Sequence, residues 1–211
     1  MRRVIQVLFV LIIIVLGYLI VESIMEPIRF NKEVKVRESA TIKRLIEIRE
    51  AQKAYKDIYK QYTGSFDTLI SFLDTSYFQV VKAIGDIPED WLEEMGFDKA
   101  RIKALAEGII IRDITQVPVL DSLFGEGFNS DSLRYVPYTK GVQFTMESGE
   151  ILTSSNLTVQ VLEVSVLYDD LLKGMDEQLI VNYKDERMKI VGFEGVKFGS
   201  LEEGTVTGNW E

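Results

Sequence analysis

The chain has 211 residues, 24 lysines and arginines against 33 aspartates and glutamates, and a formal net charge of −9. This acidic balance argues against nucleic acid as a partner, because the phosphate backbone requires a basic face. The chain contains no histidine and no cysteine, which excludes histidine-dependent triads, histidine-ligated or thiolate-ligated metals, and disulfides. An enzyme would have to rely on carboxylates, lysine or tyrosine. We therefore expect a non-enzymatic protein with no cofactor and no metal site.

The N-terminal segment carries the strongest signal in the chain. After Met1-Arg2-Arg3, residues 4–21 are almost entirely apolar, and about 18 apolar residues are enough to cross a bilayer as a helix. We predict a transmembrane anchor at residues 4–25, embedded in the lipid bilayer. Positive charge favours the cytoplasmic side, so residues 1–3 are expected to be cytoplasmic and the part of the chain beyond the anchor to be exported. The predicted location is the bacterial inner membrane, with one pass and a periplasmic C-terminal domain.

A cleaved signal peptide is the alternative to an anchor, because it shares the charged start. Its apolar core spans only about 7–15 residues and ends in a cleavage site of small residues. The sequence from Gly17 to Met25 contains no such site. The pattern therefore favours a signal anchor that is retained.

Residues 26–63 follow as a long amphipathic helix or stalk. Pro27 is expected to bend this helix or restart it just past the membrane surface. From Arg29 to Tyr62 there is neither proline nor glycine, and apolar residues recur at intervals of three and four, the pattern of one helical stripe. Such a helix would extend roughly 50 Å. It must lie along the domain or project from the membrane.

An aromatic stripe on this helix is the candidate interaction surface. Tyr55, Tyr59 and Tyr62 recur at helical spacing, and one interpretation is that they pack against the sheet of the exported domain. The alternative is a seam for self-association, since several neighbours share their face. The candidate interaction residues are Leu45, Ile48, Gln52, Tyr55, Tyr59 and Tyr62.

Residues 64–211 are expected to form an exported α+β domain. Its pattern mixes short helices with strands that would form a small, mostly antiparallel sheet packed on the long helix. Helices are predicted at residues 66–76, 88–96, 98–107, 169–175 and 177–189. Strands are predicted at residues 109–117, 141–146 and 158–166 and around Val196.

One stretch of the long helix resembles the N-terminal helix of type IV pilins and pseudopilins. Those proteins often read R-x-A-Q-x-A-Y, then G-x-[YF] and a turn bearing leucine. The resembling residues here are Arg49-Glu50-Ala51-Gln52-Lys53-Ala54-Tyr55, then Tyr59, Tyr62, Gly64, Phe66 and Leu69. The resemblance implies an apolar N-terminal helix, an amphipathic continuation and a small sheet laid on it.

The chain departs from that family at its defining motif. Pilin precursors are cut after a glycine that precedes the apolar stretch, with a glutamate at the fifth mature position. Here the matching pair is Gly17 and Glu22, at the far end of the apolar run, where cleavage would discard the anchor. The resemblance is therefore to a pilin-like protein that keeps its anchor.

Three tripeptides resemble the acceptor for O-glycosylation of exported proteins in some Gram-negative bacteria, an aspartate followed by serine or threonine and an aliphatic residue. The candidate acceptors are Thr68, Ser122 and Ser132. The competing explanation is local, because aspartate, serine and threonine also accept backbone hydrogen bonds where helices and turns begin.

Two pairs of acids were the remaining candidates for chemistry. Asp169-Asp170 and Asp185-Glu186 carry the oxygen ligands that hard cations prefer. Adjacent residues on a helix point in different directions, so a solvated helix surface explains them better.

These features predict an envelope protein whose exported domain does structural or interaction work, a pilin-like assembly component being one form of it. Its partners would be other envelope proteins or further copies of the chain. The alternative is a membrane-tethered sensor or ligand-binding module with a cleft in the β domain. A carboxylate-dependent hydrolase is a third interpretation, which would need two facing carboxylates in a cleft.

Overall fold

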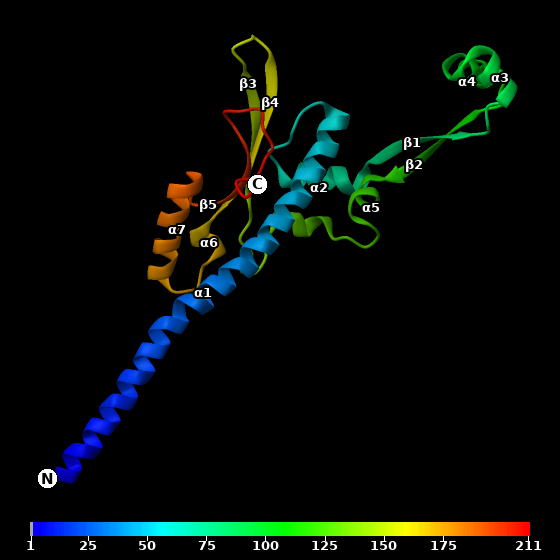
Figure 1. The fold of residues 1–211 in the computed structure, drawn as a ribbon. Helices are drawn as coiled ribbons and strands as arrows, with labels where there is room; N and C mark the ends of the chain where they lie inside the picture. The colour runs from blue at the N-terminus through cyan, green and yellow to red at the C-terminus, as the bar shows by residue number, and fades with distance from the viewer. Residues whose placement is uncertain (1) are drawn as a thin grey trace. The chain divides into compact units, whose positions relative to one another are not determined.

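The protein has the α+β fold that the sequence predicts, with one long helix, several short helices and two small antiparallel sheets (Figure 1). The structure is a computed structural model that describes residues 2–211, apart from the side chains of residues 2–5, 81–84 and 111–114. The elements are α1 (Arg2–Tyr59), α2 (Phe66–Thr75), β1 (Tyr77–Ile84), α3 (Glu89–Met95), α4 (Phe97–Ala106), β2 (Ile111–Pro118), α5 (Val119–Phe124), η1 (Ser130–Arg134), β3 (Thr145–Leu152), β4 (Thr158–Leu167), α6 (Tyr168–Leu171), α7 (Glu177–Val191) and β5 (Gly195–Ser200).

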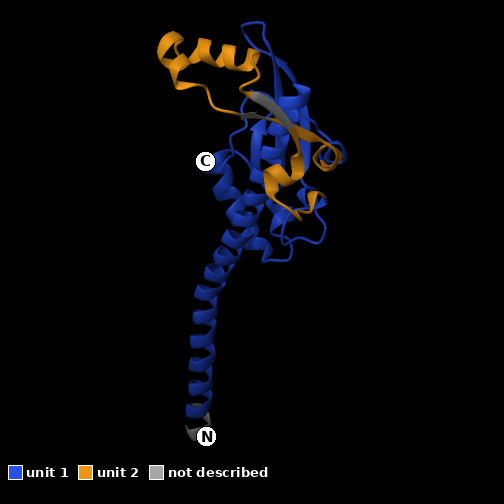
Figure 2. Cartoon of the chain, turned by 90° about the vertical axis from the view of Figure 1, so that its right-hand side faces the viewer, with its two compact units in different colours: residues 1–69, 131–211 blue, residues 70–130 orange. Residues whose placement is uncertain are grey.

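The chain divides into two compact units (Figure 2). Unit 1 comprises residues 1–69 and 131–211, and unit 2 comprises residues 70–130, which are inserted between the two parts of unit 1. The segments 26–63 and 64–211 expected from the sequence divide the chain differently. Helix α1 and the three-stranded sheet belong to the same unit, because they share one core.

Helix α1 is a single element of 58 residues. The restart expected at Pro27 does not occur, since the helix continues through that residue. Proline removes one backbone hydrogen bond and crowds the preceding turn. On its C-terminal side Phe30 and Val34 are buried in unit 1, and on its N-terminal side the helix continues back into the apolar run that ends at Val21. Both flanks favour helix, which offsets the local cost of the proline.

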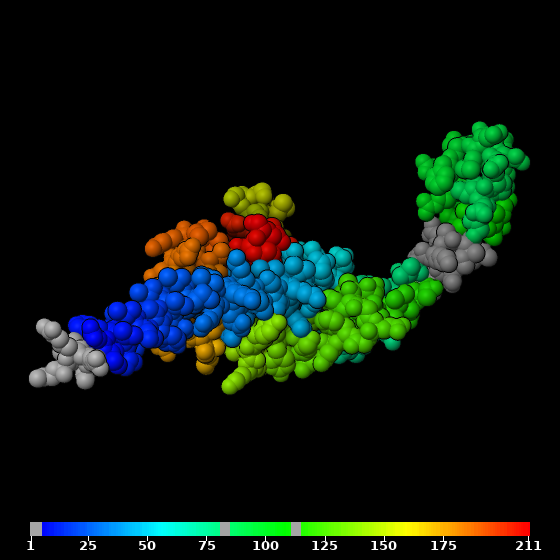
Figure 3. Space-filling view, turned by 60° about the horizontal axis from the view of Figure 1, so that its bottom comes forward, coloured from blue at the N-terminus to red at the C-terminus, as the bar shows by residue number. Residues whose placement is uncertain are grey.

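The N-terminal half of α1, dark blue in Figure 3, is apolar, and the rest of the described chain does not cover it. An 18-residue window within it has a mean hydropathy of 2.8, and none of that window is buried. Among the described residues, α1 is the one helix long and apolar enough to cross a membrane, by length and composition. A signal sequence meets the same two criteria.

The sheet of unit 1 pairs three antiparallel strands in the order β3-β4-β5. In the β3–β4 hairpin Thr145 pairs with Ser165 and Leu152 with Thr158. The strand predicted at residues 141–146 lies later in the chain than expected. Its first half pairs instead with the segment that follows η1, because Tyr135 forms a β-bridge with Gln143 and the amide of Val136 donates to the carbonyl of Val142 at 2.8 Å.

Two glycines allow β5 to approach β4 closely. Gly199 has a φ of +78°, and a Cβ there would overlap the carbonyl of Leu162. A Cβ at Gly195 would overlap the carbonyl of Val166 in the same way. The glycines near the C-terminus are therefore a requirement of strand packing.

The core of unit 1 lies between α1 and this sheet. Leu45 and Ile48 of α1, Leu162 of β4 and Phe198 of β5 are all fully buried. Burying a side chain of this size stabilises a fold by about 1.5–3 kcal/mol. The C-terminal half of α1 is therefore the spine of unit 1, continuous with the apolar half.

A partly buried polar cluster joins α1 to α6 and α7. The Glu38 carboxylate accepts hydrogen bonds from the hydroxyls of Tyr168 and Tyr183, the latter at 3.1 Å. Arg187 Nε donates to the Tyr168 hydroxyl at 3.2 Å. Burial, together with the Glu38 carboxylate, raises the pKa of both tyrosines, that of Tyr183 to about 12. This cluster fixes α7 beside α1.

Unit 2 contains a two-stranded antiparallel ribbon with two helices between its strands, flanked by the C-terminal part of α2 and by α5. β1 and β2 pair from Tyr77 opposite Pro118 to Ile84 opposite Ile111. Helices α3 and α4 connect the strands and correspond to the helices predicted at residues 88–96 and 98–107. β2 corresponds to a predicted strand, whereas β1, α5 and η1 were not predicted.

Candidate functional site

Four of the six candidate interaction residues on α1 lie inside unit 1. The four buried residues are Leu45, Ile48, Gln52 and Tyr55. Tyr59 is 52% exposed, and its ring centroid lies 4.7 Å from that of Tyr55. Tyr62 is half-buried, and its hydroxyl accepts a hydrogen bond from Lys56 Nζ at 3.2 Å. Of the six, Tyr59 and Tyr62 offer surface to a second molecule, and self-association through them stays a prediction.

Gln52 has a role within the chain that its spacing did not reveal. Its side-chain amide donates to the carbonyl of Thr63 at 2.7 Å, and its carbonyl accepts from the amide of Thr63 at 3.1 Å. The side chain thus pairs with the backbone of the segment that leaves α1. Ala51 and Ala54, which flank Gln52 in the sequence, are also buried. Residues 49–55 therefore include the part of α1 that packs against the rest of unit 1.

The three glycosylation candidates all lie in helical turns. Thr68 in α2 and Ser122 in α5 are exposed, whereas Ser132 in η1 is half-buried and accepts a hydrogen bond from Arg44 Nη1. The backbone amide of Thr68 donates a hydrogen bond to the hydroxyl of Ser65 at 3.4 Å. Modification at these positions stays a prediction.

The acidic pairs are engaged locally or exposed. Asp169 forms an ion pair with Lys184 at 2.5 Å, and Asp170, Asp185 and Glu186 are exposed. Within the part of the chain that the structure describes, no group of three or more carboxylates could hold a metal ion.

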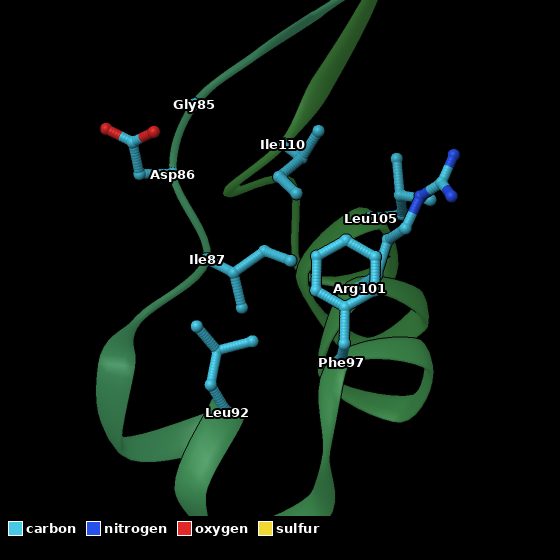
Figure 4. Close-up of a pocket in the computed structure, with 8 residues that line it drawn as sticks. All are labelled: Gly85, Asp86, Ile87, Leu92, Phe97, Arg101, Leu105 and Ile110. Carbon is cyan, nitrogen blue, oxygen red and sulfur yellow. The ribbon is translucent and has the colours of Figure 1, made fainter.

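Unit 2 contains an open groove. It has a volume of about 440 Å³ and lies between α3, α4 and the adjoining end of the ribbon (Figure 4). Ile87 and Leu92 face the ring of Phe97 across the opening, while the carboxylate of Asp86 points away from it. The apolar lining consists of Ile87, Leu92, Phe97, Leu105 and Ile110.

The helices around the groove bury very little of their own apolar surface. No residue of α3 is buried, and in α4 the buried residues are the small Ala100 and Ala104. Phe97 is 61% exposed and Ile102 is 69% exposed. A surface that gathers large apolar side chains in this way is typical of a site that another molecule covers.

The groove lies in an acidic segment. The segment from residue 85 to residue 110 carries seven carboxylates and three basic residues, with Glu89, Asp90, Glu93 and Glu94 on the short helix α3. Of the three basic side chains, Arg101 lines the groove, and Lys103 lies over the ring of Trp91, with its nitrogen 4.0 Å from the ring centroid. The groove is therefore an apolar surface in an acidic segment, with Asp86 and Arg101 as its charged lining residues.

Sequence reasoning predicted both helices of the groove but not the groove itself. Ile87 precedes α3 and Ile110 follows α4, and the two residues line one cavity because β1 and β2 pair. One signal in the sequence could have indicated the groove. Helices of 7 and 10 residues are too short to bury all the large apolar side chains that this segment carries.

Comparisons with protein-family models, curated proteins and solved structures found no match to this chain. The features that remain for assigning a function are a long N-terminal apolar helix, a small α+β unit packed on it, and the groove of unit 2. Function must therefore be inferred from these sites and their chemistry.

Proposed function

We propose that the protein is a non-enzymatic, single-span envelope protein that tethers a protein-binding module to the inner membrane. The apolar half of α1 is its anchor, the domain beyond is exported, and the groove of unit 2 binds an amphipathic helix of another envelope protein. The observation that carries the proposal is the pairing of an uncovered apolar helix with an uncovered apolar groove in one chain.

The continuity of α1 supports the role of a tether. Large apolar side chains from Val7 to Val21 are exposed, and a bilayer is the environment in which such a run is stable. The same helix then buries Leu45 and Ile48 in the core of unit 1. A helix that serves as both anchor and core holds unit 1 at a defined height, as a flexible linker would not.

Charge supports export of the domain. Arg2 and Arg3 precede the apolar run, which favours a cytoplasmic N-terminus. On the other side of the run, Arg29 pairs with Glu22 at 2.9 Å. Lys32, Lys35 and Arg37 also follow the run, interspersed with Glu26, Glu33 and Glu38, so the proposed orientation depends on the charge that precedes the run.

The occupant proposed for the groove is a helix with an apolar stripe flanked by lysine or arginine. An amphipathic helix in an apolar groove is a recurrent mode of peptide recognition. The acidic excess of residues 85–110 favours basic flanks, because complementary charge accelerates association and like charge opposes it. The same excess disfavours adhesion of this unit to anionic lipid.

Pilin-like assembly is a specific form of this proposal. The long helix with an antiparallel sheet packed on its C-terminal half has the layout that the resemblance implies, and Tyr59 provides exposed aromatic surface on that helix. In such an assembly, the basic helix would belong to a neighbouring subunit or an associated envelope protein.

The test measures binding of two synthetic helical peptides to the full chain in neutral-lipid nanodiscs. The peptides share one apolar stripe, flanked by lysines in one and by glutamates in the other. We expect the lysine peptide to bind, with an affinity that falls as salt is raised, and the glutamate peptide to bind at least tenfold more weakly.

Matched variants locate the binding surface. Phe97→Ser should lower the affinity for the lysine peptide at least tenfold. Ile190→Ser, at a site in α7 that is 66% exposed, should leave that affinity unchanged. Equal binding of the two peptides, or equal effects of the two variants, would contradict the proposed groove function.

A further inference from the structure

A second cleft lies in unit 1, independent of the groove. It has a volume of about 390 Å³ and is bordered by α1, by the loop before β3 and by the segment that follows α6. Its basic side chains are Arg37, Lys140 and Lys173, and Asp170 is the one carboxylate among its lining residues. Such a grouping of cations is notable in a chain with a net charge of −9.

Arg37 is held in place at the wall of this cleft. Its Nε donates to the Glu33 carboxylate at 3.0 Å, and its Nη1 donates to the carbonyl of Leu171 at 3.1 Å. The side chain is 16% exposed. Among the described residues no hydrogen bond uses Nη2, which leaves that corner of the guanidinium fork for a ligand. A fixed cation of this kind loses little freedom when it binds an anion.

The two lysines complete the basic lining. Lys140 and Lys173 are exposed, and neither forms an ion pair with any residue that the structure describes. Lys140 lies in the loop before β3 and Lys173 in the segment after α6. An anion in the cleft could therefore contact cations from two further segments besides Arg37.

Tyr138 adds an aromatic wall to the cleft. Its φ of +62° lies in the left-handed region, which non-glycine residues seldom occupy and which is often found at functional sites. The ring is 63% exposed. The loop is tied down beside it, since the hydroxyl of Thr139 donates to the carbonyl of Val136 at 2.7 Å. The strained backbone therefore presents an aromatic face next to the cations.

We propose that this cleft binds a soluble phosphate monoester, with the phosphate on Arg37, Lys140 and Lys173 and the organic part against the ring of Tyr138. The volume suits a compound of the size of a sugar phosphate. Arg37 follows Met25 by twelve residues of continuous helix, which is about 18 Å along the axis. A lipid headgroup, confined to the first several ångströms beyond the hydrocarbon, does not reach it.

The test is calorimetric titration of the full chain in neutral-lipid nanodiscs with glucose 1-phosphate, inorganic phosphate and glucose. Glucose 1-phosphate should bind most tightly, inorganic phosphate at least fivefold more weakly, and glucose not measurably. The double variant Lys140→Gln, Lys173→Gln should lower the affinity for glucose 1-phosphate at least tenfold. Lys189→Gln, which removes one lysine charge at an exposed site in α7, is the control and should leave the affinity unchanged.

Tyr138→Gly separates the two parts of the site. Glycine accepts the left-handed backbone, so the loop is retained while the ring is lost. Glucose 1-phosphate should then bind no better than inorganic phosphate. Equal binding of glucose and glucose 1-phosphate, no binding of either phosphate compound, or insensitivity to the double variant would overturn the proposal. Competition by phosphatidylglycerol added to the nanodiscs would overturn the assignment to a soluble ligand.

Discussion

The C-terminal half of α1 and helix α4 both carry large apolar residues, but they differ in how far these residues are buried. Leu45 and Ile48 of α1 are fully buried in unit 1, whereas Phe97 and Ile102 of α4 are more than half exposed. The apolar stripe on α1 is covered by the sheet of its own unit. Helix α4 has only a narrow ribbon and a 7-residue helix as local neighbours. Apolar patterning alone therefore does not distinguish a core from a binding surface; the amount of partner surface in the same unit does.

The largest expected effect comes from truncating the buried stripe. Leu45→Ala should lower the free energy of unfolding by about 2–5 kcal/mol, because it removes buried methyl groups and leaves a cavity. Ile46→Ala, at a neighbouring site that is 37% exposed, should cost markedly less. Urea unfolding of the full chain in detergent, followed by circular dichroism, measures both. Equal losses would mean that α1 is not the spine of unit 1.

A smaller loss is expected at Gln52. Gln52→Leu keeps the side-chain volume but leaves the amide and carbonyl of Thr63 without their partner, at a cost of about 1–3 kcal/mol. Lys53→Leu, on the exposed face next to it, is the control. A Gln52 variant as stable as that control would show that water satisfies Thr63 equally well.

The polar cluster at Glu38 makes the stability of unit 1 depend on pH at the alkaline end. Burial and the Glu38 carboxylate raise the pKa of Tyr183 to about 12, above the value of about 10 for an unfolded chain. The folded state therefore holds a proton that the unfolded state releases, so this contribution is complete below about pH 10 and is lost as pH rises towards 12.

The urea midpoint measured from pH 8 to pH 12 should fall less steeply above pH 10 in Tyr183→Phe than in the unmodified chain. Tyr135→Phe, at a site that is 38% exposed, serves as the matched loss of a hydroxyl. If both variants follow the same pH profile as the unmodified chain, Tyr183 does not contribute.

The smallest expected effect is at the exposed apolar residues of α4. Phe97→Ser and Ile102→Ser should change the free energy of unfolding by less than about 0.5 kcal/mol, because both side chains are largely exposed and contribute little to a core. The same urea experiment measures this. A loss of several kcal/mol would place these residues in the core of unit 2 and remove the contrast with α1.

The elements that could be predicted from the sequence are those with a strong local pattern. The apolar run, the stripe of α1 and the helices between Pro88 and Glu107 have clear periodicity or capping signals, and all are present. The continuity of α1 through Pro27 was not predictable, because it depends on burial of Phe30 and Val34 by residues far along the chain.

The elements that were missed depend on pairing. β1 has the β-branched and aromatic residues of a strand, including Tyr77 and Phe78, but a strand is defined by its partner, and β2 lies beyond two helices. Both candidate binding sites have the same origin. The groove joins Ile87 to Ile110, and the basic cleft joins Arg37 to Lys140 and Lys173, so neither exists as a local motif.

The most direct test of the tether uses the absence of cysteine from the chain, which makes each introduced thiol unique. Lys53→Cys in α1, Glu94→Cys in α3 and Ile13→Cys in the apolar run are labelled with a membrane-impermeant maleimide in intact spheroplasts. We predict that Lys53→Cys and Glu94→Cys react at once, and that Ile13→Cys reacts only after detergent is added. Labelling of Lys53→Cys or Glu94→Cys only after the membrane is permeabilised, or immediate labelling of Ile13→Cys, would contradict an exported module held by the apolar half of α1.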